Sequence, residues 1–274
     1  MTTRFLCRAG LVAVAVLTAI YLVAPVFVVV PTSFNDSSFL EFPPKDLSLR
    51  WYESFFTDPA WVNSALNSLQ IGVWVTLLSV VLGTAAALAM VRGRYPLRAA
   101  VGALLVAPIL VPYVILGLAV YALFLELGLT QTILGFVLVH TALAVPFVVI
   151  NVGSALVSFD ERLELAAMNL GASRLTTFLR VTLPNILPSM GAGALFAFIT
   201  SFDEVVTSIF LAGPDVSTLP VQMWSGVRVQ IDPTVAAVST MLLLITVALF
   251  AVAGLVRALG ARRAQKALVA AENA

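Results

Sequence analysis

The sequence has few of the residues from which metal and redox sites are built. Among its 274 residues there is one cysteine, Cys7, and one histidine, His140, and 11% of the residues are charged. A single cysteine excludes an internal disulfide, and without a cluster of cysteines or histidines it indicates no metal site. We therefore expect no bound metal.

The motifs of common catalytic and nucleotide-binding sites are also missing. The sequence contains no G-x-x-x-x-G-K-[ST] phosphate-binding loop, no H-E-x-x-H and no G-x-S-x-G. It therefore lacks the usual device for ATP hydrolysis and the signatures of a zinc protease or a serine esterase. The net charge of +1 gives no indication of nucleic-acid binding. We expect a non-catalytic chain with no cofactor of its own and no nucleic-acid partner.

Apolar residues, in contrast, are abundant and lie in long runs. They make up 61% of the chain, and the mean hydropathy is +1.04. A helix that crosses a membrane needs about 20 mainly apolar residues. The first run is too long for the apolar part of a typical signal peptide, so we expect it to be retained. The pattern predicts an all-α membrane protein with one domain, residues 1–274, and six spans: about 9–31, 63–91, 99–125, 132–157, 189–212 and 234–257.

Basic residues gather in alternate connections between these runs, which predicts the orientation of the chain. Arginine or lysine precedes the first run and follows the second, fourth and sixth runs, whereas the opposite connections are mainly acidic. Cytoplasmic loops carry the excess of lysine and arginine in membrane proteins. Both termini are therefore predicted to be cytoplasmic.

The connection between the fourth and fifth runs, residues 158–188, is long enough to contain helices of its own. Ser158 and Glu161 have the spacing of a capping box, which predicts a helix that begins at Ser158 and continues to Asn169. Gly171 is well placed to end this helix in a left-handed conformation. The pattern predicts a helix followed by a sharp turn.

A second short helix is predicted after the turn, and the pair is too apolar for a simple connector. Ser173 is placed to cap a helix that continues to about Thr182, and Pro184 and Pro188 are placed to end it. Leucine, methionine and phenylalanine side chains occur on both helices. One interpretation is a solvated hairpin that links two spans. We favour the other, a slim helical pair that docks in a groove of a partner.

The fifth run contains two adjacent acids, Asp203 and Glu204, within the apolar segment 198–210. An ionised carboxylate at the centre of a membrane helix costs about 2.5–3.5 kcal/mol. On a continuous helix, at about 100° per residue, the acids lie on the same side as Thr200 and Thr207. This polar stripe predicts that the four residues face a bundle interior or a wet cavity.

Two roles are open for these acids. Asp203 lies about 14 residues into the run, or roughly 21 Å along a helix, toward the external face. There the acids would line the outer part of a solute path, where they attract a cationic solute or hold an external gate. Alternatively they only fix helix packing, through an arginine or by protonation. We favour a path or gate role, and for His140 we favour hydrogen-bonded packing over a proton relay.

Several segments of the sequence resemble those of a known family. The segment LELAAMNLGASRLTTFLRVTLPNILP is similar to the EAA loop of ATP-binding-cassette (ABC) importer permeases, whose pattern is E-A-A-x-x-x-G followed by L-P near the next span. The segments NSLQIGVWVT, ALAMVRGRYPLR, SFDEVVTSIFLAGP and TLPVQMWSGVRVQIDP resemble the second permease component of polyamine-type importers. The resemblance covers about residues 10–257.

The resemblance implies that the 158–188 loop, hereafter the coupling loop, binds an ATPase. In one place the loop departs from the pattern, because Leu165 stands where the glutamate is expected and Glu164 lies one residue earlier. We expect Glu164 to substitute imperfectly for that contact, or the contact to be absent. The residues to which the resemblance assigns ATPase coupling are Glu164, Ala166, Ala167, Gly171, Ala172, Ser173 and Pro184.

The resemblance also implies partners and a location. The chain would lie in the bacterial inner membrane, in contact with lipid, and form a path together with a second permease subunit. Two ATPase subunits would bind ATP and magnesium, and an external binding protein would deliver a polyamine or a similar small cationic or polar solute.

Two other classes of protein compete with this interpretation. A stand-alone ion-coupled secondary carrier would use Asp203 and Glu204 as its ion sites, but it needs no ATPase dock. Such carriers often have two inverted halves, and the sequence shows no clear internal repeat. A membrane-embedded enzyme has no motif in its favour.

Overall fold

The structure is a computed structural model that describes residues 2–39, 41–229 and 232–248. Within these residues the regular elements are helices, and one isolated antiparallel bridge joins Asn35 and Leu47. The chain forms two compact units. One is Pro59–Trp224, and the other combines residues 1–58 with the chain from residue 225 onward.

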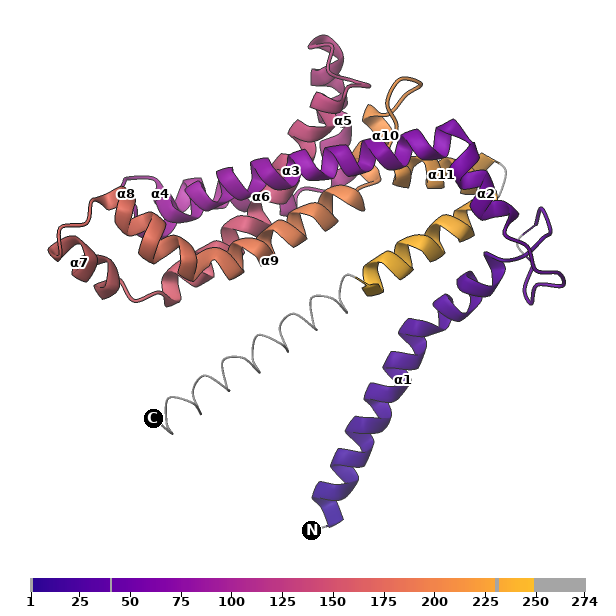
Figure 1. Ribbon diagram of the computed structural model, residues 1–274, viewed down its shortest axis with the longest axis horizontal. Coiled ribbons are helices and arrows are strands. Elements are labelled where there is room, and N and C mark those ends of the chain that lie inside the picture. Colours follow the sequence, from indigo (N-terminus) through magenta and orange to yellow (C-terminus); the bar gives the residue numbers. More distant parts are fainter. Residues whose placement is uncertain (1, 40, 230–231, 249–274) are drawn as a thin grey trace, which may run out of the picture. The chain divides into compact units, whose positions relative to one another are not determined.

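The unit Pro59–Trp224 is a bundle around three long helices, α3, α6 and α9, which pack side by side (Figure 1). Two shorter helices, α7 and α8, lie at one end of this bundle, and α10 lies at the other end. The elements of the unit are α3 (Pro59–Arg92), α4 (Arg98–Leu110), α5 (Tyr113–Glu126), α6 (Ile133–Ser158), α7 (Arg162–Asn169), α8 (Arg174–Thr177), the π-helix η1 (Phe178–Thr182), α9 (Leu183–Phe202), α10 (Val206–Leu211) and the start of α11 (Leu219–Val229).

The centre of the bundle is packed tightly enough to require small residues. Val148 of α6 is fully buried. A Cβ atom added at Gly83 of α3 would lie 2.6 Å from the Cβ of Val148, and one added at Gly193 of α9 would lie 3.1 Å from its Cα. Small residues permit this close approach of helices, which is how apolar membrane helices gain packing energy.

The other unit contains α1 (Thr2–Thr32), α2 (Arg50–Thr57) and a helix from Thr234 to Ala248. Side chains of α2 hold the segment that follows α1. Tyr52 shares a hydrogen bond with Ser33, with 2.7 Å between the hydroxyl oxygens, and the indole of Trp51 donates to the carbonyl of Asn35 at 2.8 Å.

The predicted all-α membrane fold is confirmed, but the count of six spans is not. Four helical segments of the described chain are long and apolar enough to cross a membrane: Gly10–Thr32, Pro59–Arg92, Ile133–Ser158 and Arg174–Phe202. A bent helix pair raises the count to five. Of the sixth expected span, 234–257, the structure describes the helix Thr234–Ala248, and residues 249–257 lie outside the described residues.

The expected third span, 99–125, is not one helix. It consists of α4 and α5, which meet at an angle of 102°. Val111 is extended (φ −80°, ψ 130°) and Pro112 precedes the first residue of α5. A proline disfavours the helical conformation in the residue before it. This effect agrees with the extended conformation of Val111, whereas α4 continues through Pro108.

The close approach at Val148 gives a test of the bundle. Gly83→Ala places a methyl group against α6, and overpacking of this kind costs about 1–3 kcal/mol. Gly191→Ala in α9 is the matched control, because nothing lies within 4 Å of its added Cβ. We expect Gly83→Ala to lower the thermal unfolding temperature of the purified chain in detergent, and Gly191→Ala to leave it unchanged or raise it. Equal effects of the two variants would contradict the packing described.

Candidate functional site

The two acids lie at a break in the fifth span, not on a continuous helix. Helix α9 ends at Phe202, the next three residues are not helical, and α10 begins at Val206. The continuous helix that we expected over 189–212 is therefore divided. Consequently, the helical-wheel relation between the acids and Thr207 does not hold across the break.

The side chain of Glu204 explains the break. Its carboxylate accepts hydrogen bonds from the backbone N–H groups of Thr207 and Ser208, at 2.8 and 2.9 Å. It also accepts from their hydroxyls, at 2.7 and 3.0 Å. The first N–H groups of a helix have no partner within the helix. Glu204 supplies that partner, and the side chain competes with the helical conformation in the way that short polar side chains do at caps.

His140 of α6 connects this cap to the helix before the break. Its Nδ1 lies 3.0 Å from the hydroxyl oxygen of Ser201, and its Nε2 lies 3.1 Å from that of Ser208. The Nε2 is also 3.6 Å from a carboxylate oxygen of Glu204. His140, Ser201, Glu204 and Ser208 are all buried. One histidine therefore joins α6 to both sides of the break, an arrangement that agrees with a hydrogen-bonded packing role for His140.

The four residues predicted to share a polar stripe divide into two groups. Glu204 and Thr207 are buried and bonded to each other. Asp203 is exposed at the surface of the chain, and Thr200 is half-buried. The structure brings Glu204 and Thr207 together and turns Asp203 away from them. A helical wheel also puts Ser208 near this stripe, but it does not reveal Ser201, a polar residue within an apolar run, as a partner.

The first helix of the coupling loop begins later than expected. Ser158 is the last residue of α6, and its hydroxyl donates to the carbonyl of Ser154 within that helix at 3.0 Å. The carboxylate of Asp160 instead accepts from the N–H of Arg162, the first residue of α7, at 2.9 Å. The predicted capping box at Ser158 is therefore wrong, because α6 extends through that residue.

The turn at Gly171 is present as predicted. Gly171 has φ +88°, in the left-handed region. Its N–H bonds to the carbonyl of Met168 at 3.0 Å, and the N–H of Ala172 bonds to that of Ala167 at 3.1 Å. This pair of bonds is the Schellman motif, which satisfies the last carbonyls of a helix. We call residues 170–173 the elbow.

After the elbow the chain forms one continuous helical segment. Ser173 caps α8, because its side chain accepts from the N–H of Thr176 at 3.2 Å. The chain then passes through η1 into α9 without a stop at Pro184 or Pro188, both of which lie within α9. Pro184 is the second residue of α9 and directly follows the change from η1 to α9. The expected end of the second helix near Thr182 is therefore a change of helix type.

The surface of the α7–elbow–α8 segment is strongly apolar for a loop. Leu170 is 90% exposed, and Leu163, Leu165 and Leu175 are also exposed. Ala166, Gly171 and Ser173 are exposed, and Ala167 and Ala172 are half-buried. Glu164 differs, because its carboxylate contacts Thr182 and Arg92 within the chain. The segment thus presents apolar side chains outward and turns its acid inward.

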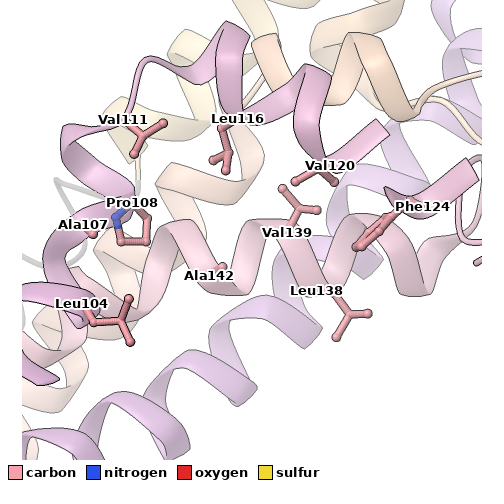
Figure 2. A pocket seen from close by; sticks show the side chains of 10 residues that line it. All are labelled: Leu104, Ala107, Pro108, Val111, Leu116, Val120, Phe124, Leu138, Val139 and Ala142. Carbon is pink, nitrogen blue, oxygen red and sulfur yellow. The ribbon is translucent and has the colours of Figure 1, made fainter. Parts of the chain in front are cut away.

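A separate apolar pocket of about 310 Å³ lies in the angle between α4 and α5, against α6 (Figure 2). A polyamine needs carboxylates or other acceptors, and these side chains offer none. The pocket is therefore a poor site for a cationic solute. Its lining residues are Leu104, Ala107, Pro108, Val111, Leu116, Val120, Phe124, Leu138, Val139 and Ala142.

The sequence can be compared with those of known proteins. A family described as "Binding-protein-dependent transport system inner membrane component" matches residues 79–264. The chain is 30% identical over 236 residues to the spermidine/putrescine transport system permease protein PotC of Haemophilus influenzae, with 86% of this chain and 91% of that protein covered. It is 34% identical over 230 residues to the putrescine transport system permease protein PotI of Escherichia coli strain K12, with 81% and 82% covered.

A solved structure has the same fold. It is the crystal structure of a bacterial ABC transporter involved in the import of the acidic polysaccharide alginate. The match has a TM-score of 0.72 and covers 92% of this chain and 96% of the matching chain, at 16% sequence identity. At this identity the likeness concerns the fold alone.

The cap at the break gives a test that separates the two acids. Glu204→Ala removes the acceptor of two backbone N–H groups and two hydroxyls that are buried, at a cost of about 3 kcal/mol or more. Glu204→Gln keeps one oxygen and should cost less. Asp203→Ala, at an exposed position, should change stability by about 0.5 kcal/mol or less. Thermal unfolding of the three variants in detergent checks this order, and equal losses for Glu204→Ala and Asp203→Ala would contradict it.

Proposed function

The chain belongs to the family of binding-protein-dependent transport system inner membrane components, and on this premise we propose how it carries solute across the membrane. It is a permease subunit of an ABC importer, a multi-pass membrane protein that is not itself an enzyme. The observation that carries the proposal is the exposed α7–elbow–α8 segment between two membrane helices. A stand-alone secondary carrier has no use for such a segment, so we set that alternative aside.

The family implies partner subunits, and we propose their number and places. Two ATPase subunits lie on the cytoplasmic side, where they bind ATP and magnesium, and a second permease subunit completes the path. An external binding protein delivers the solute. Both termini and the coupling loop are cytoplasmic, in agreement with the arginine and lysine residues of the alternate loops.

The α7–elbow–α8 segment is the proposed contact with an ATPase. Its exposed leucines offer the apolar face that a helix presents to a groove. Leu165 is exposed and Glu164 is turned inward, so the acid of the family pattern has no direct counterpart on this surface. The contact proposed here is therefore mainly apolar. The slim elbow, formed by Gly171 and its alanine neighbours, sets the angle between the two helices.

The break at the other end of α9 is the proposed wall of the solute path. Asp203 is exposed there and supplies a negative charge. The carboxyl group of Glu204, in contrast, is already bonded to the N–H groups at the start of α10. We assign to Asp203 the attraction of a cationic solute. To Glu204, Thr207 and His140 we assign the fixed geometry of the break, which a gate would need. Thr200, half-buried one turn before Asp203, lies on the same side of the path.

The class of solute follows from the relatives together with this charge. The named relatives are permeases for spermidine and putrescine, which are cations at neutral pH. An exposed carboxylate at a break in an otherwise apolar segment suits such a solute. A polyamine is therefore the proposed cargo, and a small cationic organic molecule of another kind is the second candidate.

The elbow gives the first test of function. Gly171→Val places a β-branched residue at φ +88°, a conformation that costs about 1–2 kcal/mol for residues other than glycine. We expect uptake by the assembled transporter to fall several-fold at normal expression. Gly171→Asn is the control, because asparagine tolerates this conformation. Wild-type uptake by Gly171→Val would contradict the docking role.

The exposed acid gives the second test. Asp203→Asn removes the charge and keeps the shape, so uptake of a polyamine should fall several-fold while basal ATP hydrolysis is retained. Asp203→Glu keeps the charge and should retain most of the uptake. If Asp203 instead restrains a gate, Asp203→Asn should raise ATP hydrolysis in the absence of binding protein. Uptake and hydrolysis that both match the wild type would remove Asp203 from the site.

A further inference from the structure

Arg92 lies where α3 meets the coupling loop. It is the last residue of α3, and its side chain is 21% exposed. One guanidinium nitrogen pairs with a carboxylate oxygen of Glu161, and the other lies 3.5 Å from one of Glu164. The guanidinium also lies 5.7 Å from the centre of the Phe159 ring. Arg92 thus contacts the chain just before α7 and within its first turn.

The carboxylate of Glu164 extends this contact to a third element. The same oxygen that faces Arg92 accepts a hydrogen bond from the hydroxyl of Thr182 at 2.6 Å. Thr182 is buried at the end of η1, directly before α9. The Glu164 side chain is 23% exposed, so most of it is covered by these neighbours. One carboxylate therefore joins the end of α3, the start of α7 and the start of α9.

Helix α7 needs such an attachment. It has eight residues, none of them buried. An isolated helix of this length is at best marginally stable in water. At its C-terminal end the hydrogen bonds of the elbow fix the turn that links α7 to α8. At its N-terminal end Glu161 and Glu164 interact favourably with the helix dipole, and both side chains pair with Arg92.

We propose that Arg92 is a positioning residue that, through Glu164, fixes α7 to the ends of α3 and α9, so that the three helices move together when an ATPase displaces α7. This inference rests on the proposed function of the coupling loop. With both ends of α7 attached, a displacement passes to the two long helices. With only the elbow attached, α7 would pivot and absorb it.

An alternative partner for Arg92 is an acidic group outside the chain, such as a lipid phosphate or an ATPase side chain. The low exposure of the Arg92 side chain, together with its two carboxylate partners, favours the internal role. The two roles give different results when the chain is studied without ATPase subunits.

The first experiment measures hydrogen exchange of the full chain in lipid nanodiscs, without partner subunits. Arg92→Met keeps the length of the side chain and removes its charge. We expect the amides of residues 162–170 to exchange roughly tenfold faster than in the wild type, because charge-assisted bonds to α7 are lost. Amides in the middle of α3 should be unchanged, which shows that the variant is folded. Arg94→Met is the matched control, at an exposed arginine two residues away.

A double-mutant comparison tests whether Arg92 acts through Glu164. Glu164→Gln alone should also speed exchange in α7, and Thr182→Val should do so by a smaller factor. Adding Glu164→Gln to Arg92→Met should have little further effect if the two residues act as a unit. Wild-type exchange in Arg92→Met, or effects that multiply in the double variant, would overturn the inference.

The same variants in the assembled transporter connect the attachment to coupling. Arg92→Met should lower the amount of solute imported per ATP hydrolysed several-fold, with the ATPase subunits still bound, and Arg94→Met should not. Normal coupling in Arg92→Met would overturn the inference and leave the proposed function intact. If the wild-type assembly imports no solute, the proposed function fails, while hydrogen exchange still reports whether Arg92 holds α7.

Discussion

The structure depends on one constraint of the bilayer, which is that backbone N–H and C=O groups in hydrocarbon must find partners within the protein. Long helices satisfy it, and in the part of the chain that the structure describes two of the expected spans, 99–125 and 189–212, are interrupted. At Val111–Pro112 a proline forces the turn between α4 and α5. At Asp203–Val205 the freed N–H groups of α10 are bonded by the carboxylate of Glu204. The side chain of one acidic residue in an apolar segment therefore supplies the hydrogen-bond acceptors that this break requires.

Helix α9 connects the two ends of the bundle. Helix α9 has 20 residues and thus a length of about 30 Å. It follows α8 and η1 directly after the elbow and ends at the break beside Asp203. Because α9 packs against α3 and α6 along the bundle, it is suited to carry a displacement from the proposed ATPase contact to the proposed path. His140 bonds to Ser201 near one end of this helix, and Glu164, which faces Arg92, accepts a hydrogen bond from Thr182 just before its other end.

The sequence was sufficient for the features that depend on local patterns. Apolar run length predicted the all-α membrane fold, and a single glycine predicted the left-handed turn at Gly171. It was insufficient where distant residues decide the conformation. Ser158 has the spacing of a cap, but α6 continues through it, and Asp160 accepts from the first N–H of α7 instead. A helical wheel assumes a continuous helix, so it could not separate the exposed Asp203 from the buried Glu204. The partners of Glu164 lie 72 and 18 residues away, at Arg92 and Thr182, where no local pattern points.

We propose that this chain forms part of the solute path of an ATP-driven importer and that the coupling loop connects it to the ATPase subunits. The most direct measurement is uptake of radiolabelled putrescine or spermidine into proteoliposomes that contain the chain assembled with its second permease and ATPase subunits. We expect uptake that requires both ATP on the side of the ATPase subunits and binding protein on the opposite side. Uptake by the chain alone, driven by a proton or sodium gradient without ATP, would contradict it.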